Sequence, residues 1–325
     1  MDYNWRQVDP SRIVFEDKTF KICEPAVIET LVSSIGRIGL INPPFLLPHE
    51  SQFIIVCGFS RVQACRQLGW TQMPARCLDP HTLWSQCALL AVAEAVYQRP
   101  LNIIEQARAL DLLNGSFNTL LEAHEAARDA GLAINPKLSE KLLKVKAFGG
   151  ELQQGLGEGT VGLPVALRIH DMLTPGDAEE LSVFFRQLRL SLTRQKEVLD
   201  WIEAIVRRDG ITLDTLLADP QIQKWRNDSQ LEDPQRSRLI REYLKRRCYP
   251  AISAFEEHYA QALEKVAMGD GIKFAPPAHF EGQSFSLQID FSNHDECVQR
   301  IAATQQLVRL SAFRELLEPH FKPDH

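Results

Sequence analysis

The periodicity of apolar residues changes twice along the 325 residues of this chain, which limits the folds that it can adopt. Up to about residue 80, short apolar runs bounded by turn residues alternate with helical patterns, as in a small mixed α/β domain. Helical patterns then dominate to about residue 265. The last part returns to period-two alternation, followed by one more helix. We therefore predict an α+β protein: a small mixed α/β domain, an all-α middle domain and a small C-terminal module of one β-hairpin and a helix.

A strand-to-helix turn in the first part is the clearest candidate site. The apolar run 53–57 predicts a buried strand and the pattern from residue 59 to 68 predicts a helix, so the sequence Cys57-Gly58-Phe59-Ser60-Arg61 connects the two. A glycine there lets the backbone approach a ligand, and the free N–H groups at the start of a helix suit an anion. Arg61 could clamp phosphate oxygens with two parallel hydrogen bonds. Because Gly-x-x-Arg is common by chance, a tight turn with a surface arginine is the alternative.

The segments around this turn carry a longer ordered pattern. Residues 34–43 read S-I-x-x-x-G-L-I-x-P, and residues 58–74 read G-x-x-R-x-x-A-x-x-x-L-G-x-x-x-x-P. Together with the helical segments that follow, this series resembles the ParB-type partition proteins over about residues 7–205. The resemblance implies a ParB/sulfiredoxin-like N-terminal domain, a fold shared with sulfiredoxins and certain serine kinases, followed by a helix-turn-helix.

The resemblance also implies a nucleotide pocket that holds CTP with Mg²⁺. It places the glycine turn on the phosphates, the loop after residue 39 on the opposite wall, and the segment 94–107 near the metal. The implied nucleotide-binding residues are Gly39, Asn42, Gly58, Ser60, Arg61, Glu94, Gln98 and Arg99, and Glu94 is the implied metal ligand.

Two substituted residues depart from the family pattern, and Arg99 lies one position later than the arginine of the family motif. Phe59 stands where hydrolysing members have an acidic residue, and a phenyl ring cannot orient water or accept a proton. Ala95 stands where the family has asparagine, which removes one oxygen from the surroundings of the metal. We therefore expect weak CTP hydrolysis at most and assign no catalytic residue. A phosphoryl-transfer enzyme of the serine-kinase type and a nucleotide-independent DNA-binding adaptor remain the alternatives.

A helix-turn-helix is predicted in the middle part. Residues 120–132 read as a helix closed by glycine, and a second helix begins at Pro136 after Asn135, a good N-cap. Lys137, Lys141 and Lys144 share one face of the second helix and predict contacts with DNA phosphates. A solvated lysine face is the alternative.

A second basic segment lies at residues 235–247. It is amphipathic, and Arg236, Arg241 and Lys245 are its candidate DNA contacts, although a solvated face paired to nearby acids would have the same pattern. The net charge of −6 excludes a protein that coats nucleic acid by bulk charge alone. It is compatible with two limited basic patches.

The organisation that follows is three domains: residues 1–98, 99–215 and 216–325. The C-terminal module has more apolar surface than about 50 residues bury alone, so we expect it to form a homodimer, with packing inside the chain as the alternative. The expected partners are DNA and, by resemblance alone, a partition ATPase. The sequence shows no membrane segment or export signal, and its seven cysteines suggest reduced thiols, so a cytoplasmic protein associated with the nucleoid or a plasmid is expected.

Overall fold

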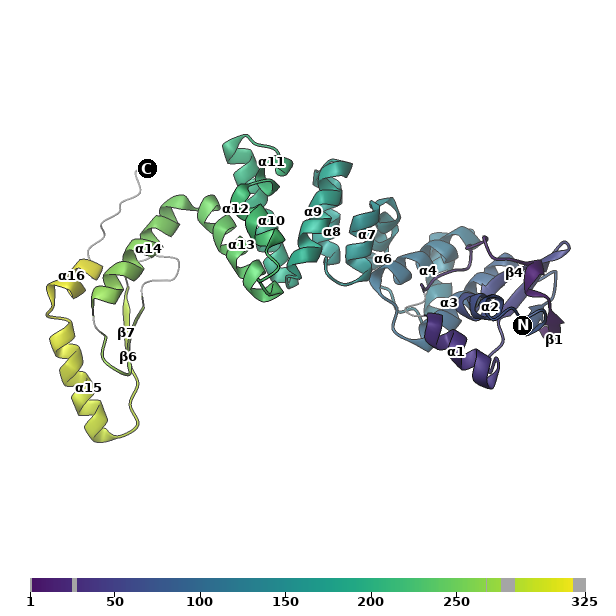
Figure 1. Ribbon diagram of the computed structural model, residues 1–325, viewed down its shortest axis with the longest axis horizontal. Coiled ribbons are helices and arrows are strands. Elements are labelled where there is room, and N and C mark those ends of the chain that lie inside the picture. Colours follow the sequence, from purple (N-terminus) through teal and green to yellow (C-terminus); the bar gives the residue numbers. More distant parts are fainter. Residues whose placement is uncertain (1, 25–27, 267, 276–283, 318–325) are drawn as a thin grey trace. The chain divides into compact units, whose positions relative to one another are not determined.

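The computed structural model describes residues 2–24, 28–266, 268–275 and 284–317 (Figure 1). The chain divides into two compact units, residues 1–199 with 213–237, and residues 200–212 with 238–325. The sheet and the pocket described below lie in the first unit. The three-domain boundaries at residues 98 and 215 stay a prediction.

A five-stranded mixed sheet organises the start of the first unit. Its strands are β1 (Tyr3–Val8), β2 (Ile13–Val14), β3 (Phe45–His49), β4 (Gln52–Cys57) and β5 (Met73–Leu78), in the order β1-β5-β3-β4-β2. The pairs β1–β5 and β3–β4 are antiparallel, whereas β3–β5 and β2–β4 are parallel. The strand predicted at residues 53–57 is confirmed as β4, and β1 and β2 were not predicted.

Helices cover this sheet and continue the first unit. They are α1 (Ile28–Ile38), α2 (Phe59–Gln67), α3 (Trp84–Gln98), α4 (Ile103–Ser116), α5 (Leu120–Asp129), α6 (Pro136–Lys144), α7 (Gly150–Gly157), α8 (Leu163–Met172), α9 (Pro175–Leu188), α11 (Leu213–Leu217) and α12 (Pro220–Asn227), with 3₁₀ turns at Pro10–Arg12 and Val145–Ala147. One hydrophobic core runs from the sheet through α2 and α3 to α4 and α5. The sheet domain and the first helices of the middle part therefore share their interior.

Two long helices pass from the first unit into the second, α10 (Leu192–Asp209) and α13 (Asp233–Cys248). The second unit continues with α14 (Pro250–Lys265), a two-stranded antiparallel hairpin of β6 (Ile272–Ala275) and β7 (Ser286–Ile289), α15 (His294–Leu307) and α16 (Ser311–Leu317). The α+β class and the C-terminal hairpin-plus-helix module are confirmed. No helix of the described residues has the length and apolar character needed to cross a membrane.

Four helices differ from what the sequence pattern suggests. The helical pattern that continues to about residue 265 is broken near its end, because Pro250 lacks an N–H and starts α14 as a separate helix. The one helix expected after the period-two segment is two helices, α15 and α16. Helix α7 was not predicted, since three of its eight residues are glycine, and neither was α12, although Asp219 caps it through the N–H of Gln221 at 2.9 Å.

Candidate functional site

The turn after β4 has the backbone that the Gly-x-x-Arg pattern requires. Gly58 is the N-cap of α2 with φ of 92°, a left-handed conformation that side chains disfavour. A Cβ atom at this position would lie 2.9 Å from Nε of Arg61 and 3.0 Å from Cβ of Pro44. Glycine is therefore required twice, by the conformation of the turn and by the close approach of Arg61.

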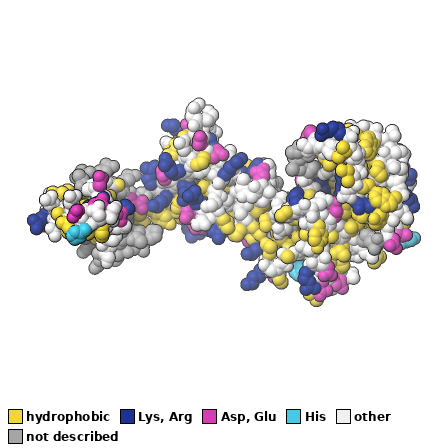
Figure 2. All heavy atoms as spheres, turned by 90° about the horizontal axis from the view of Figure 1, so that it is seen from below, with side chains coloured by type: hydrophobic (Ala, Val, Ile, Leu, Met, Phe, Trp, Pro, Cys, Tyr) yellow, Lys and Arg dark blue, Asp and Glu magenta, His cyan; other side chains and the backbone are white. Residues whose placement is uncertain are grey.

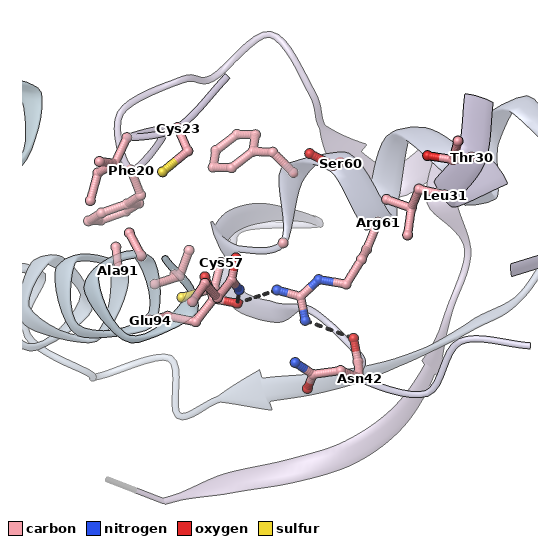
Figure 3. Close-up of a pocket in the computed structure, with 16 residues that line it drawn as sticks. Phe20, Cys23, Thr30, Leu31, Asn42, Cys57, Ser60, Arg61, Ala91 and Glu94 are labelled. Atoms are coloured by element: carbon pink, nitrogen blue, oxygen red, sulfur yellow. Dashed lines mark hydrogen bonds and ion pairs between the residues drawn. The ribbon is translucent and has the colours of Figure 1, made fainter. Parts of the chain in front are cut away.

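Arg61 crosses from this turn to the wall formed by α3 (Figure 3). One terminal nitrogen donates to the carbonyl oxygen of Asn42 at 2.8 Å, and the other forms an ion pair with the Glu94 carboxylate. Gln98, one turn further along α3, donates to the same carboxylate oxygen. The side chains of Arg61 and Glu94 are 12% and 23% exposed, so both charges are largely withdrawn from water and satisfy each other.

A pocket of about 680 Å³ opens around this ion pair. Six of the eight nucleotide-binding candidates line it: Asn42, Gly58, Ser60, Arg61, Glu94 and Gln98. The structure therefore brings together residues from the loop after α1, the glycine turn and α3, which lie up to 56 positions apart in the sequence.

The other two candidates lie outside the pocket lining. Gly39 ends α1 with φ of 83°, where its N–H donates to the Ile35 carbonyl oxygen at 2.9 Å. Arg99 forms two hydrogen bonds with Glu105, at 2.6 and 2.7 Å, and thereby braces the capping box of α4. The structure gives Gly39 and Arg99 structural roles, and their assignment to the nucleotide-binding site stays a prediction.

One wall of the pocket was missed by the sequence argument. Phe20, Ile22 and Cys23 line the pocket from the irregular segment between β2 and α1, and Thr30 and Leu31 line it from α1. The segment has no periodicity, so its apolar residues gave no signal beyond their composition. Burial is the largest cause that raises the pKa of Cys23 to about 11, which keeps this thiol protonated at neutral pH.

The two residues that depart from the family pattern also lie at the pocket. Phe59 is 8% exposed and Ala95 is 6% exposed, and both line the cavity. Neither side chain offers a polar atom to a ligand. Cys57, the residue before the glycine, is 3% exposed and is therefore a core thiol, and burial raises its pKa beyond the usual range for a thiol.

The pocket lining offers a metal ion one carboxylate, that of Glu94, and not a complete set of protein ligands. Among the described residues, no group of three or more His, Cys, Asp or Glu side chains is arranged to hold a metal. Glu94 fits a hard cation such as Mg²⁺, which characteristically takes one or two carboxylates and completes its shell with water and substrate phosphates. The residues present therefore fit a metal that arrives with a phosphate-bearing ligand.

The sequence model of the ParB N-terminal domain matches residues 4–91, which include the sheet, the glycine turn and part of α3. This part of the chain is therefore similar to the ParB N-terminal domain. A nucleoid occlusion protein of Lysinibacillus sphaericus (strain C3-41) is 30% identical over 125 residues, which are 38% of this chain and 38% of that relative. The chain thus spans well under half of the length of this curated relative.

Three solved ParB structures are also similar to parts of the chain. The Caulobacter crescentus ParB complexed with CTP-γ-S is 20% identical, covers 56% of this chain and 98% of that chain, and gives a TM-score of 0.26. The same protein complexed with the centromeric parS site is 17% identical, with 59% and 97% covered and a TM-score of 0.34. A Pnob8-like ParB-N domain is 13% identical, with 61% and 97% covered and a TM-score of 0.39. At these scores the likeness does not define the arrangement of the whole chain.

The predicted helix-turn-helix corresponds to α5 and α6. Gly131 turns the chain between them with φ of 83°, and Asn135 caps α6 by accepting from the N–H of Leu138 at 2.8 Å. Nε2 of His124 lies 2.6 Å from Oγ of Ser139, which ties the two helices together.

The lysines of α6 differ in their surroundings. Lys137 and Lys141 are exposed and have no ion pair in the described part of the chain, whereas Nζ of Lys144 lies 3.5 Å from Oδ2 of Asp171. Two of the three predicted contacts are therefore available to phosphate without breaking an existing interaction.

The three predicted DNA contacts of α13 interact with other residues of the protein. Arg236 donates to Asp233 at 2.7 Å and to three main-chain carbonyl oxygens between 2.9 and 3.2 Å, and its side chain is 16% exposed. Lys245 pairs with Glu256 at 3.0 Å, and the Arg241 guanidinium lies 5.9 Å from the ring centre of Trp201. Figure 2 shows Lys and Arg side chains with Asp and Glu side chains among them on the visible face. The structure thus gives these three residues internal roles, which weakens their assignment as DNA contacts.

Proposed function

We propose that this chain is a ParB-like DNA-binding protein whose hold on DNA is gated by a nucleotide, CTP with Mg²⁺, in DNA partition or the regulation of a mobile element. The observation that carries the proposal is the pairing of Arg61 with Glu94 across the pocket at the N-terminus of α2. A guanidinium for phosphate oxygens and a carboxylate for a cation are the two groups that a metal-bound triphosphate needs. The choice of CTP rests on the family resemblance.

Each pocket residue has a defined task in this proposal. The free N–H groups at the start of α2 and the Arg61 guanidinium bind phosphate oxygens, and Gly58 lets the phosphates reach the backbone. Asn42 orients Arg61 through its carbonyl oxygen. When bound, Mg²⁺ supplies positive charge between the phosphates and the Glu94 carboxylate.

Gating requires a second copy of the chain. We propose that the nucleotide favours docking of two N-terminal domains and so closes a clamp around DNA, as a shift between two populated states. The C-terminal module supplies the permanent homodimer, and a partition ATPase is the further partner that the resemblance implies. DNA lies against α6, through Lys137 and Lys141.

A nucleotide-independent DNA-binding adaptor is the second candidate function. Phe59 and Ala95 favour it, because they line the pocket with apolar atoms where the family has an acid and an amide. A serine-kinase-like phosphoryl transfer has less support, since no acidic or histidine side chain follows Gly58 in the turn.

Calorimetric titration of CTP with Mg²⁺ tests the proposal. We expect saturable binding to the wild type and about 10- to 100-fold weaker binding to Arg61→Ala, because a hydrogen bond to a charged group contributes about 1.5–3 kcal/mol. A DNA selection with and without CTP then tests the gate. Equal CTP binding by both proteins would refute the pocket, and DNA retention that is the same in both conditions would favour the adaptor.

A further inference from the structure

A second cavity in the first unit is lined by arginines and has no role in the function proposed above. It has a volume of about 450 Å³ and lies among the C-terminal end of α9, α12, and the start of α13. Its charged lining residues are Arg186, Arg189, Arg226, Arg236, Glu158 and Asp233. Four arginines and two carboxylates line it, and two further carboxylates, Glu151 and Glu180, lie near Arg186 and Arg226.

Two of the four arginines are saturated by the protein itself. Arg186 pairs with Glu158 through two hydrogen bonds of 3.2 Å and with Glu151. Arg236 is held by Asp233 and by main-chain carbonyl oxygens. These two side chains build the walls of the cavity and have little capacity left for a ligand.

The other two arginines retain capacity. Arg226 is half-buried, and its Nε donates a hydrogen bond to the side-chain oxygen of Gln187 at 2.9 Å. Its guanidinium carbon lies 5.5 Å from the ring centre of Phe184. Burial lowers the pKa of Arg226, opposed by the nearby Glu180, so its charge is held where water compensates it poorly.

Arg189 faces the same cavity from the end of α9. Its side chain is 72% exposed, and its ion pair with Asp233 is long, with Nε 3.9 Å from Oδ2. A pair of this length at an exposed position contributes little. An anion that enters the cavity can therefore recruit Arg189 without breaking a strong contact.

We propose that this cavity is a second anion site, in which Arg226 and Arg189 bind a phosphate group. Arg226 provides the fixed, partly desolvated anchor, and Arg189 closes over the ligand from the exposed side. Guanidinium groups offer the paired donors that phosphate oxygens accept, and they stay charged at all physiological pH values. The phosphate belongs either to a small ligand or to the backbone of DNA, since both present the same chemistry.

The test uses inorganic pyrophosphate as the probe, in a buffer without phosphate or sulfate. Titrations are made on the Arg61→Ala protein, so that the nucleotide pocket does not contribute. We expect the Arg226→Gln change in this background to weaken pyrophosphate binding at least about tenfold, and Arg189→Ala about three- to tenfold. Lys196→Ala, a charge change on α10 outside the cavity lining, serves as the matched control and should have no effect.

A DNA arm identifies the source of the phosphate. If it belongs to DNA, the salt dependence of DNA affinity falls by about one ion for each arginine removed, whereas a small-ligand site leaves that slope unchanged. Arg189 is exposed, so its variant remains informative if Arg226→Gln lowers the melting temperature. Unchanged pyrophosphate binding and an unchanged DNA slope in both variants would overturn the proposal. CTP binding by the wild-type protein is measured separately. A negative result for the arginine-lined cavity can therefore be told apart from a negative result for the nucleotide pocket.

Discussion

The ion pair between Arg61 and Glu94 makes a sharp prediction about how a nucleotide enters the pocket. In the free protein, Glu94 forms an ion pair with the Arg61 guanidinium that we assign to the phosphates, and Gln98 donates a hydrogen bond to the same carboxylate. A triphosphate without metal must displace Glu94 and then face an unpaired carboxylate. We therefore expect Glu94→Gln to strengthen binding of CTP in EDTA and to reduce the gain that Mg²⁺ provides.

The size of this effect follows from the burial of the pair. Exposed ion pairs contribute up to about 1 kcal/mol, and breaking a fully buried pair costs about 3–5 kcal/mol. With side chains 12% and 23% exposed, this pair lies between the two cases, and after discounting for solvent we expect about 1–2 kcal/mol. That corresponds to about 5- to 30-fold tighter metal-free binding in the variant.

Calorimetry with EDTA and with Mg²⁺, on the wild type and on Glu94→Gln, measures both quantities. Glutamine keeps the shape of the side chain and an oxygen for Gln98, so the pocket wall is preserved. Glu125→Gln, an exposed change of the same charge on α5, is the matched control. If Glu94→Gln bound metal-free CTP no better than the wild type, Glu94 would not oppose metal-free binding. The proposed competition between Glu94 and the phosphates for Arg61 would then be wrong.

Three further predictions concern other parts of the chain. Arg99→Ala should lower the free energy of unfolding by about 1–3 kcal/mol in urea, because it leaves Glu105, which is 3% exposed, without its guanidinium. Burial opposes ionisation of Glu105, but Arg99 and the Asn102 N–H outweigh it and lower the pKa of Glu105. The stabilisation by this pair is therefore complete above the usual carboxyl pKa and is lost as pH falls through the lower pKa of the folded state. Acid unfolding of Arg99→Ala should accordingly show a weaker pH dependence than that of the wild type. Replacing Lys137 and Lys141 by alanine should reduce the salt slope of DNA binding by about one ion each, and an unchanged slope would remove α6 from the interface. Iodoacetamide should alkylate Cys23 at pH 8 at least about 100-fold more slowly than a free thiol, because its pKa is raised to about 11, and mass spectrometry of timed samples measures the rate.

The sheet domain was predictable where burial leaves a sequence pattern. Strand β4 is buried at five of its six positions and reads as an apolar run. Strand β1 is exposed at five of six positions, so it has no apolar alternation to recognise. It is held by pairing with β5 along its whole length. This pairing is a backbone interaction and therefore leaves no pattern in the side chains.

The glycine turn of the candidate pocket could be predicted from the sequence, whereas the wall formed by Phe20, Ile22 and Cys23 could not. The glycine turn follows from local rules, since a strand, a glycine and a helix start must meet there. The segment that supplies Phe20 and Cys23 has no regular structure, and tertiary packing brings it to the same pocket as the residues of α3. Arg99 illustrates a different limit, because its partner Glu105 is near in the sequence but is selected by the capping geometry of α4.

A count of basic residues in the sequence does not show which of them are already paired within the protein. The run from Arg236 to Arg247 is the densest basic segment of the sequence, yet Arg236 holds the turn before α13 and Lys245 pairs with Glu256. Affinity for DNA depends on the phosphates that cations neutralise, and a cation already neutralised by the protein releases few counterions. The less conspicuous Lys137 and Lys141, exposed on α6, are therefore the stronger candidates for contact with DNA. If alanine at Arg236 and Lys245 reduced the salt slope more than alanine at Lys137 and Lys141, internal pairing would not limit a cation's access to phosphate in this protein.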